Sequence, residues 1–123
     1  MIHRIFALGL LLLLGAAPTA AQELIRIGFL TILTGPLAAP GKEMENGIRL
    51  FMEEHKNALS GRPVELTVLD TGGTPAGTLA KARELAEQRK VHVIIGPLAA
   101  FEAYAIAPYV NTQRVPTISP SAA

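Results

Sequence analysis

Residues 91–100, VHVIIGPLAA, decide the fold of this chain. The first half is an almost continuous run of branched apolar residues, which is typical of a strand buried on both faces of a parallel sheet. Gly96 and Pro97 end the strand, and the residues from Leu98 onward fit a helix. This strand, turn and helix predict backbone N–H groups at the carboxyl edge of a sheet, where open α/β sheets bind their ligands.

Three further strands are predicted beside this one. Residues 24–30 (LIRIGFL) are apolar enough for a first buried strand. Residues 63–70 (PVELTVLD) alternate apolar and polar side chains, as a half-covered strand does. Residues 115–119 (VPTIS) predict a short last strand. A loop rich in glycine and proline, residues 31–41, follows the first strand, and its composition argues against either a strand or a helix there.

Three helices are predicted between the strands. The first runs from residue 42 to about residue 57, with an apolar stripe that comprises Met44, Ile48, Phe51 and His55. The second has Thr74 as its N-cap and Pro75 in its first position, and Arg83 and Glu87 are spaced to pair on its surface. The third covers residues 99–113, and Pro108 is expected to kink or divide it.

The alternation of strands and helices predicts an α/β fold, a three-layer sandwich with a parallel sheet in the order 2-1-3-4. Its switch point, where ligands bind, lies between the first and third strands. Two loops, residues 34–41 and 96–101, would flank this point, and both contain GPLAA. We therefore expect Gly35 and Gly96 to lie on one rim, where a ligand can approach backbone N–H groups.

Residues 1–21 have the layout of a secretory signal peptide, with a basic start, an apolar run and small residues before Gln22. We expect cleavage after Ala21. A membrane anchor is the alternative, but the apolar run is shorter than the roughly 20 residues of a spanning helix. The sequence therefore predicts an exported, periplasmic protein that is not inserted in the membrane after the signal is removed.

Composition argues against several classes of function. Loss of Arg4 with the leader leaves ten basic and ten acidic residues, dispersed along the chain, so no nucleic-acid partner is expected. The chain has no cysteine, which excludes a disulfide, a lipid anchor on cysteine and a thiolate metal site. Neither GxGxxG nor GxxxxGK[ST] occurs, so the usual phosphate-binding loops are absent. We predict no metal and no cofactor.

Catalytic residues are equally hard to find. His55 and His92 fall on a helix stripe and inside a strand, where a structural role is favoured over a catalytic one. Asp70 is the one carboxylate at the ligand-facing end of a strand. Its side chain is expected to cap the following TGG turn, and direct contact with a ligand is the less favoured alternative. The pattern favours a binding module over an enzyme.

Several motifs together resemble a known family. A leader, then IRIGFLTILTGPLAAPGKEMENGIRLFMEE, LDTGGTPAGTLAKARELAEQRKVHVIIGPL and RVPTISPSAA are similar to the opening of the class I periplasmic solute-binding proteins of ABC importers, in the leucine/isoleucine/valine-binding group. The resemblance implies two α/β lobes joined by a hinge, which close on an amino acid or small organic acid and deliver it to a permease. Residues 22–123 would be a partial N-terminal lobe, without the hinge and the second lobe.

The resemblance also implies ligand contacts, and three of their side chains are missing here. The hydroxyl that binds the ligand carboxylate in amino-acid binders corresponds to Ala100. A second hydroxyl corresponds to Ala123, and an aromatic residue of the first loop to Pro40. Ser119 and Ser121 keep hydroxyls near the end of the last strand.

Backbone N–H groups at Ala100 and Phe101 remain for an anion at a helix N-terminus. We therefore expect a small carboxylate, an aromatic or aliphatic organic acid rather than a typical zwitterionic amino acid. Phe101 would lie near its apolar part or pack on its own helix or Tyr104, and both alternatives stay open.

Transport is the leading function, as the substrate-binding component of an ABC importer. The alternative is a ligand-sensing lobe of a regulatory receptor with the same fold, and an enzyme on a flavodoxin-like sheet is disfavoured for lack of catalytic geometry. Because half of the cleft wall would come from another lobe, residues 22–123 alone are expected to bind weakly.

Overall fold

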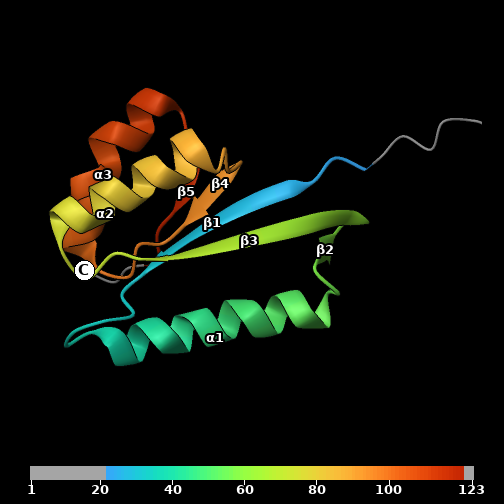
Figure 1. The fold of residues 1–123 in the computed structure, drawn as a ribbon, viewed down its shortest axis with the longest axis horizontal. Helices are drawn as coiled ribbons and strands as arrows, with labels where there is room; N and C mark the ends of the chain where they lie inside the picture. Colours follow the sequence, from blue (N-terminus) through green and yellow to red (C-terminus); the bar gives the residue numbers. More distant parts are fainter. Residues whose placement is uncertain (1–21, 121–123) are drawn as a thin grey trace, which may run out of the picture.

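The computed structural model describes residues 22–120, so the expected signal peptide at residues 1–21 lies outside the described residues. Figure 1 shows a single sheet between two layers of helices. The elements, in chain order, are β1 (Ile25–Thr31), α1 (Ala38–Glu54), β2 (Ala58–Leu59), β3 (Arg62–Asp70), α2 (Pro75–Arg83), the π-helical segment η1 (Glu84–Gln88), β4 (Val93–Ile95), α3 (Ala100–Gln113) and β5 (Thr117–Ile118).

The sheet has the strand order β2-β3-β1-β4-β5. β1 pairs in parallel with β3 on one side and with β4 on the other, and β4 pairs in parallel with β5. The four parallel strands, in the order β3-β1-β4-β5, therefore confirm the predicted order 2-1-3-4. The sequence reading missed β2, a two-residue strand that runs antiparallel to the start of β3.

β1, rather than the strand at residues 91–95, is the centre of the sheet. Its residues from Ile27 to Thr31 are all buried, whereas in β4 only Ile94 is buried and its two neighbours are half-buried. The difference follows from topology. β1 lies between the long strand β3 and β4, whereas β4 has only the two-residue strand β5 on its outer side. Val91 and His92 precede β4, so the predicted strand also began two residues too early.

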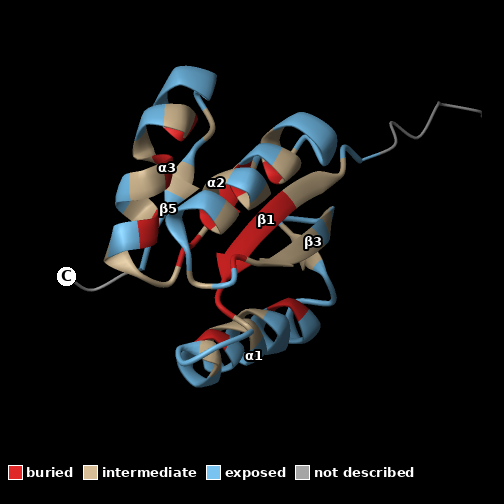
Figure 2. Cartoon of the chain, turned by 60° about the vertical axis from the view of Figure 1, so that its left-hand side comes forward, coloured by how far each residue is buried: buried red, intermediate tan, exposed pale blue. Residues whose placement is uncertain are grey.

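Helices cover the two faces of the sheet unequally. α1 lies on one face, and α2, η1 and α3 lie on the other (Figure 1). The main core fills the second interface, and Figure 2 shows its buried residues on β1 and on the inward sides of α2 and α3. The cluster consists of Leu30, Ala82, Leu85, Ile94, Ile106 and Val110. Gly28 lets Leu85 approach β1, because an added Cβ would lie 2.6 Å from a methyl carbon of Leu85.

α1 begins earlier than predicted and buries only part of the predicted stripe, since Met44 and Ile48 are half-buried. The helix starts at Ala38, so Pro40 lies in its first turn and not in the preceding loop. Proline is tolerated in a first turn because the N–H groups there have no intrahelical acceptor. Gly41 packs so closely on β1 that an added Cβ would be 1.7 Å from the Ile32 carbonyl oxygen. Met52 is buried, whereas Phe51 and His55 are exposed and stack on each other with ring centroids 4.0 Å apart.

The other two helices agree better with the sequence. Thr74 caps α2 by accepting a 3.0 Å hydrogen bond from the Gly77 N–H, and Pro75 is its first residue. α3 runs unbroken through Pro108, contrary to a division of the helix there. Within residues 22–120 no helix is both long enough and apolar enough to cross a membrane.

Candidate functional site

The candidate site is the edge of the sheet where the parallel strands end. Phe29 of β1 is in register with Ile95 of β4, so the loops that follow these strands leave from the same edge. The loops that contain Gly35 and Gly96 therefore both leave the sheet at this rim. β3 and β5 end at the same edge, and their following residues, 71–74 and 119–120, complete it.

Gly96 is the closest backbone approach on this rim. Its φ is +104°, and a Cβ at this position would lie 2.1 Å from the Leu30 carbonyl oxygen, so only glycine fits. The Gly96 N–H donates a 2.8 Å hydrogen bond to the Ile118 carbonyl. This N–H belongs to the sheet, so ligand contacts on the β4 side fall to the residues that follow Gly96.

The first turn of α3 presents two such donors. Within residues 22–120, the N–H groups of Ala100 and Phe101 donate to no acceptor, because they open the helix. Phe101 is 44% exposed and does not stack on Tyr104, which is 76% exposed. The turn thus combines two unused donors, the positive end of a helix and an exposed aromatic side chain.

Ser119 connects the end of β5 to the turn after β4. Its hydroxyl donates a 3.3 Å hydrogen bond to the Pro97 carbonyl. Next to it, between α3 and β5, is a hollow of about 490 Å³ lined by residues that include Ile106, Val110 and Pro116. Of the other predicted contacts, Ser121 and Ala123 lie outside the described residues, and Pro40 is exposed on α1.

Asp70 organises the loops on the β3 side. Its Oδ1 accepts 2.9 Å hydrogen bonds from the N–H groups of Leu33 and Gly72, and its Oδ2 accepts one of 2.8 Å from the Thr34 hydroxyl. Burial acts to raise the pKa of Asp70, but the Leu33, Gly72 and Thr34 hydrogen bonds outweigh it and lower the pKa below its ordinary value of 3.8. The expected cap of the TGG turn is present, and the same carboxylate also holds the loop after β1.

The sequence reading missed Glu102, which is fully buried in the first turn of α3. Its Oε1 accepts hydrogen bonds from the hydroxyls of Thr71 and of Thr78, the latter at 3.0 Å, and its Oε2 accepts one of 3.2 Å from the Ala99 N–H. A glutamate in the third helical position is half of a capping box, and this was the signal available in the sequence. The other half of a capping box is absent, because Ala99 has no side-chain oxygen.

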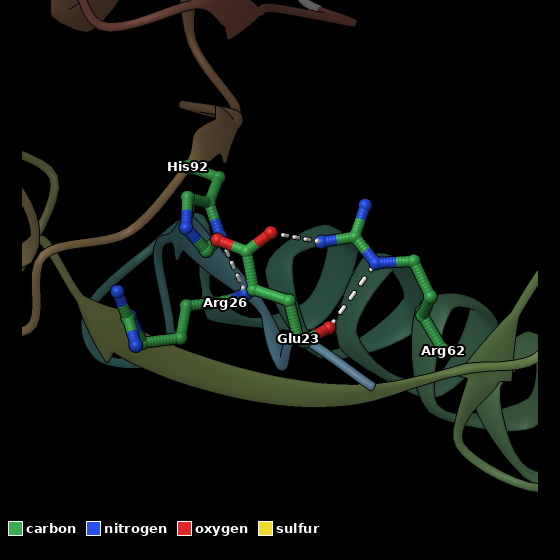
Figure 3. Close-up of polar contacts among 4 residues, drawn as sticks. All are labelled: Glu23, Arg26, Arg62 and His92. Carbon is green, nitrogen blue, oxygen red and sulfur yellow. Dashed lines mark hydrogen bonds and ion pairs between the residues drawn. The ribbon is translucent and has the colours of Figure 1, made fainter. Parts of the chain in front are cut away.

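The two histidines of the described residues contact nearby backbone groups. His92 directly precedes β4 and so lies at the opposite, amino-terminal edge of the sheet, and Figure 3 shows it beside an ion pair of Arg62 and Glu23. Its ring Nδ1 accepts a 2.9 Å hydrogen bond from the Arg26 backbone N–H, and the His92 backbone N–H donates to the Arg26 carbonyl. The Nδ1 of His55 lies 2.7 Å from the Phe51 carbonyl oxygen. Within residues 22–120 no group of three His, Asp or Glu side chains is placed to hold a metal ion.

A family model described as "Periplasmic binding protein" matches residues 24–123. The chain belongs to this family. A curated relative, "Leu/Ile/Val-binding protein homolog 6" of Brucella abortus, is 30% identical over 109 residues, which cover 88% of this chain and 28% of the relative. This member of the periplasmic binding protein family thus spans about 28% of the length of the curated relatives it matches.

Two solved structures show the same fold with different ligands. The substrate-binding protein LivJ of Streptococcus pneumoniae, in complex with isoleucine, has 29% identity and a TM-score of 0.75 and covers 80% of this chain and 29% of its own. A solute-binding protein of an ABC transporter from Rhodopseudomonas palustris, in complex with 3,4-dihydroxybenzoic acid, has 31% identity and a TM-score of 0.74. The match covers 78% of this chain and 26% of that protein. Both of these proteins of similar fold are described as substrate- or solute-binding proteins of transporters.

Proposed function

We propose that this chain is part of the substrate-binding component of an ABC importer, which captures a small carboxylate and delivers it to a permease. The observation that carries the proposal is the first turn of α3. There the N–H groups of Ala100 and Phe101 stand without an acceptor among the described residues, on the same rim as the loop that contains Gly35. Two backbone donors at the positive end of a 14-residue helix suit a carboxylate.

The ligand we propose is an organic acid, aromatic or aliphatic. Ala100 places a methyl group where the family resemblance implies a hydroxyl on the ligand carboxylate. A hydrogen bond to a charged group contributes about 1.5 to 3 kcal/mol, so its loss weakens the grip on an amino acid. Phe101 offers apolar area next to the donors, and a relative of similar fold binds 3,4-dihydroxybenzoic acid. Another binds isoleucine, which makes branched-chain amino acids the comparison to test.

The domain assignment is part of this proposal. Residues 1–21 act as a signal peptide that directs the protein to the periplasm, and residues 22–123 form part of the N-terminal lobe. The ligand contacts proposed for this lobe are centred on Ala100 and Phe101, and the family resemblance adds Pro40, Ser119, Ser121 and Ala123 as further candidates. The membership in the periplasmic binding protein family supports both the location and the permease partner.

Isothermal titration calorimetry of the mature, full-length protein tests the proposal. The titrants are 3,4-dihydroxybenzoate, 4-hydroxybenzoate, leucine and isoleucine, with benzamide as the neutral control for the carboxylate. We expect binding of a benzoate, weaker binding of both amino acids and none of benzamide. Strong leucine binding without binding of an aromatic acid would reject the ligand class. The same titration on residues 22–123 should show weak binding or none, and nanomolar affinity there would contradict a partial cleft.

A further inference from the structure

Glu102 joins three parts of the carboxyl edge through one side chain. Thr71 directly follows β3, Thr78 lies in α2, and Ala99 directly precedes α3. Thr71 and Ala99 donate to the Glu102 carboxyl group, and the Thr78 hydroxyl shares its one proton between Glu102 Oε1 at 3.0 Å and the Thr74 carbonyl at 2.7 Å. The Thr71 N–H in turn donates a 2.9 Å hydrogen bond to the carbonyl of Thr31, the last residue of β1. The first turn of α3 is thereby tied to the ends of β1 and β3.

This arrangement uses a buried polar group at a place where an apolar residue would fill the same space. Among the described ion pairs none involves Glu102, so its carboxyl group depends on hydrogen bonds alone. Buried carboxyl groups are costly unless their hydrogen bonds are satisfied, and here both oxygens have partners. The turn has no other side-chain cap, because residues 99 to 101 are alanine, alanine and phenylalanine.

We propose that Glu102 is a positioning residue for the ligand site. Its side chain fixes the orientation of the turn whose N–H groups, at Ala100 and Phe101, receive the ligand carboxylate. The inference rests on the proposed function, since it assigns Glu102 a role in the affinity of that same site. It does not place Glu102 in contact with the ligand, because its carboxyl group is fully buried.

Three variants of the mature, full-length protein separate positioning from stability. Glu102→Leu removes the acceptors at similar volume. Glu102→Gln keeps the shape, because its amide oxygen can accept from the Ala99 N–H and its NH₂ can donate to the oxygens of Thr71 and Thr78. Ile94→Val is the matched control, a small change at a fully buried position of the same core, in β4.

Two measurements are made on each variant. The first is the Kd for 3,4-dihydroxybenzoate by calorimetry, and the second is amide hydrogen exchange of Ala99 and Ala103 without ligand, which reports on the turn directly. We expect Glu102→Leu to raise Kd and exchange rates by about tenfold or more, as loss of a buried hydrogen bond predicts. Glu102→Gln and Ile94→Val should stay within about threefold of wild type in both.

Two results would overturn the inference: wild-type affinity in folded Glu102→Leu, or an equal loss of affinity in Ile94→Val at equal thermal stability. If Glu102→Leu does not fold, Thr78→Val, which removes one of the three donors, is compared in the same way. If the wild-type protein binds none of the titrants, the proposed function fails, and exchange at Ala99 and Ala103 still decides whether Glu102 holds the turn.

Discussion

The Tyr109 hydroxyl donates a 2.8 Å hydrogen bond to Glu87 Oε1, which links α3 to η1. The Arg83 guanidinium lies over the same ring, 5.5 Å from its centroid. Burial, together with the hydrogen bond and charge of Glu87, raises the pKa of Tyr109 to about 12, although Arg83 acts in the opposite direction. The spacing of Arg83 and Glu87 had suggested that these two residues pair. Glu87 instead pairs with a tyrosine of the neighbouring helix.

We expect this tyrosine to make stability depend on pH in the alkaline range. The folded-state pKa of Tyr109 is raised, so its contribution is complete below the ordinary value of 10.0 and is lost as pH rises toward about 12. Urea unfolding of wild type and Tyr109→Phe should therefore converge over this interval. The near-ultraviolet absorbance of phenolate should show one tyrosine that titrates near pH 12, and its persistence in Tyr109→Phe would contradict the assignment.

Asp70→Asn should lower the free energy of unfolding by roughly 1 to 2 kcal/mol at neutral pH, since it weakens hydrogen bonds to a charged group. The folded-state pKa of Asp70 is depressed, so its contribution is present above the ordinary value of 3.8 and is lost as pH falls through the folded-state pKa. Urea unfolding between neutral pH and pH 3 checks this. A difference between wild type and Asp70→Asn that persists at the acid end would argue against the charge as the cause.

Gly96→Ala should destabilise the protein by about 3 kcal/mol or more, because a positive φ and a clash with the Leu30 carbonyl coincide. Gly47→Ala is the control within the same chain. Gly47 lies in α1 with nothing within 4 Å of an added Cβ, so the change should stabilise by about 0.5 to 1 kcal/mol. Thermal unfolding of the two variants should therefore shift in opposite directions.

Leu85→Ala should cost about 2 to 5 kcal/mol, because Leu85 is fully buried in the main core. Gly28→Ala alone should also destabilise, since its methyl would lie 2.6 Å from Leu85. In the double variant the new methyl occupies part of the space that Leu85→Ala opens. The double variant should therefore lose about 1 kcal/mol less unfolding free energy than the sum of the losses in the two single variants. Strict additivity in denaturant unfolding would refute the contact.

Ala100→Ser tests the proposed ligand preference at its centre. The added hydroxyl can donate to a ligand carboxylate, so the affinity for leucine should rise about tenfold or more. Ala80→Ser, at an exposed position of α2, is the control and should leave affinity unchanged. No gain for leucine in calorimetry would mean that residue 100 does not face the ligand carboxylate.

Much of the fold could be read from local patterns. The branched apolar run before Gly96, the Thr74 and Pro75 helix start and the alternation of elements fixed the class, the order of the parallel strands and the shared rim of Gly35 and Gly96. What failed depended on tertiary packing. The buried stripe of α1 is set by the close approach of Gly41 to Ile32, which apolar periodicity does not reveal.

The candidate site divides in the same way. The unused donors at Ala100 and Phe101 follow from where a helix begins, so the sequence could indicate them. The Glu102 interaction brings together residues 24 and 31 positions apart, and no local spacing signals such a contact. The two hydrogen bonds that Asp70 accepts from the loop after β1 were missed for the same reason.

The shortness of the outer strands bears on self-association. β2 and β5 each have two residues, Pro63 lies opposite β2, and Pro116 and Pro120 flank β5 closely. Proline donates no backbone hydrogen bond, and a two-residue strand leaves few unpaired groups for another chain. The β2 margin of this sheet is therefore a poor template for amyloid-like growth.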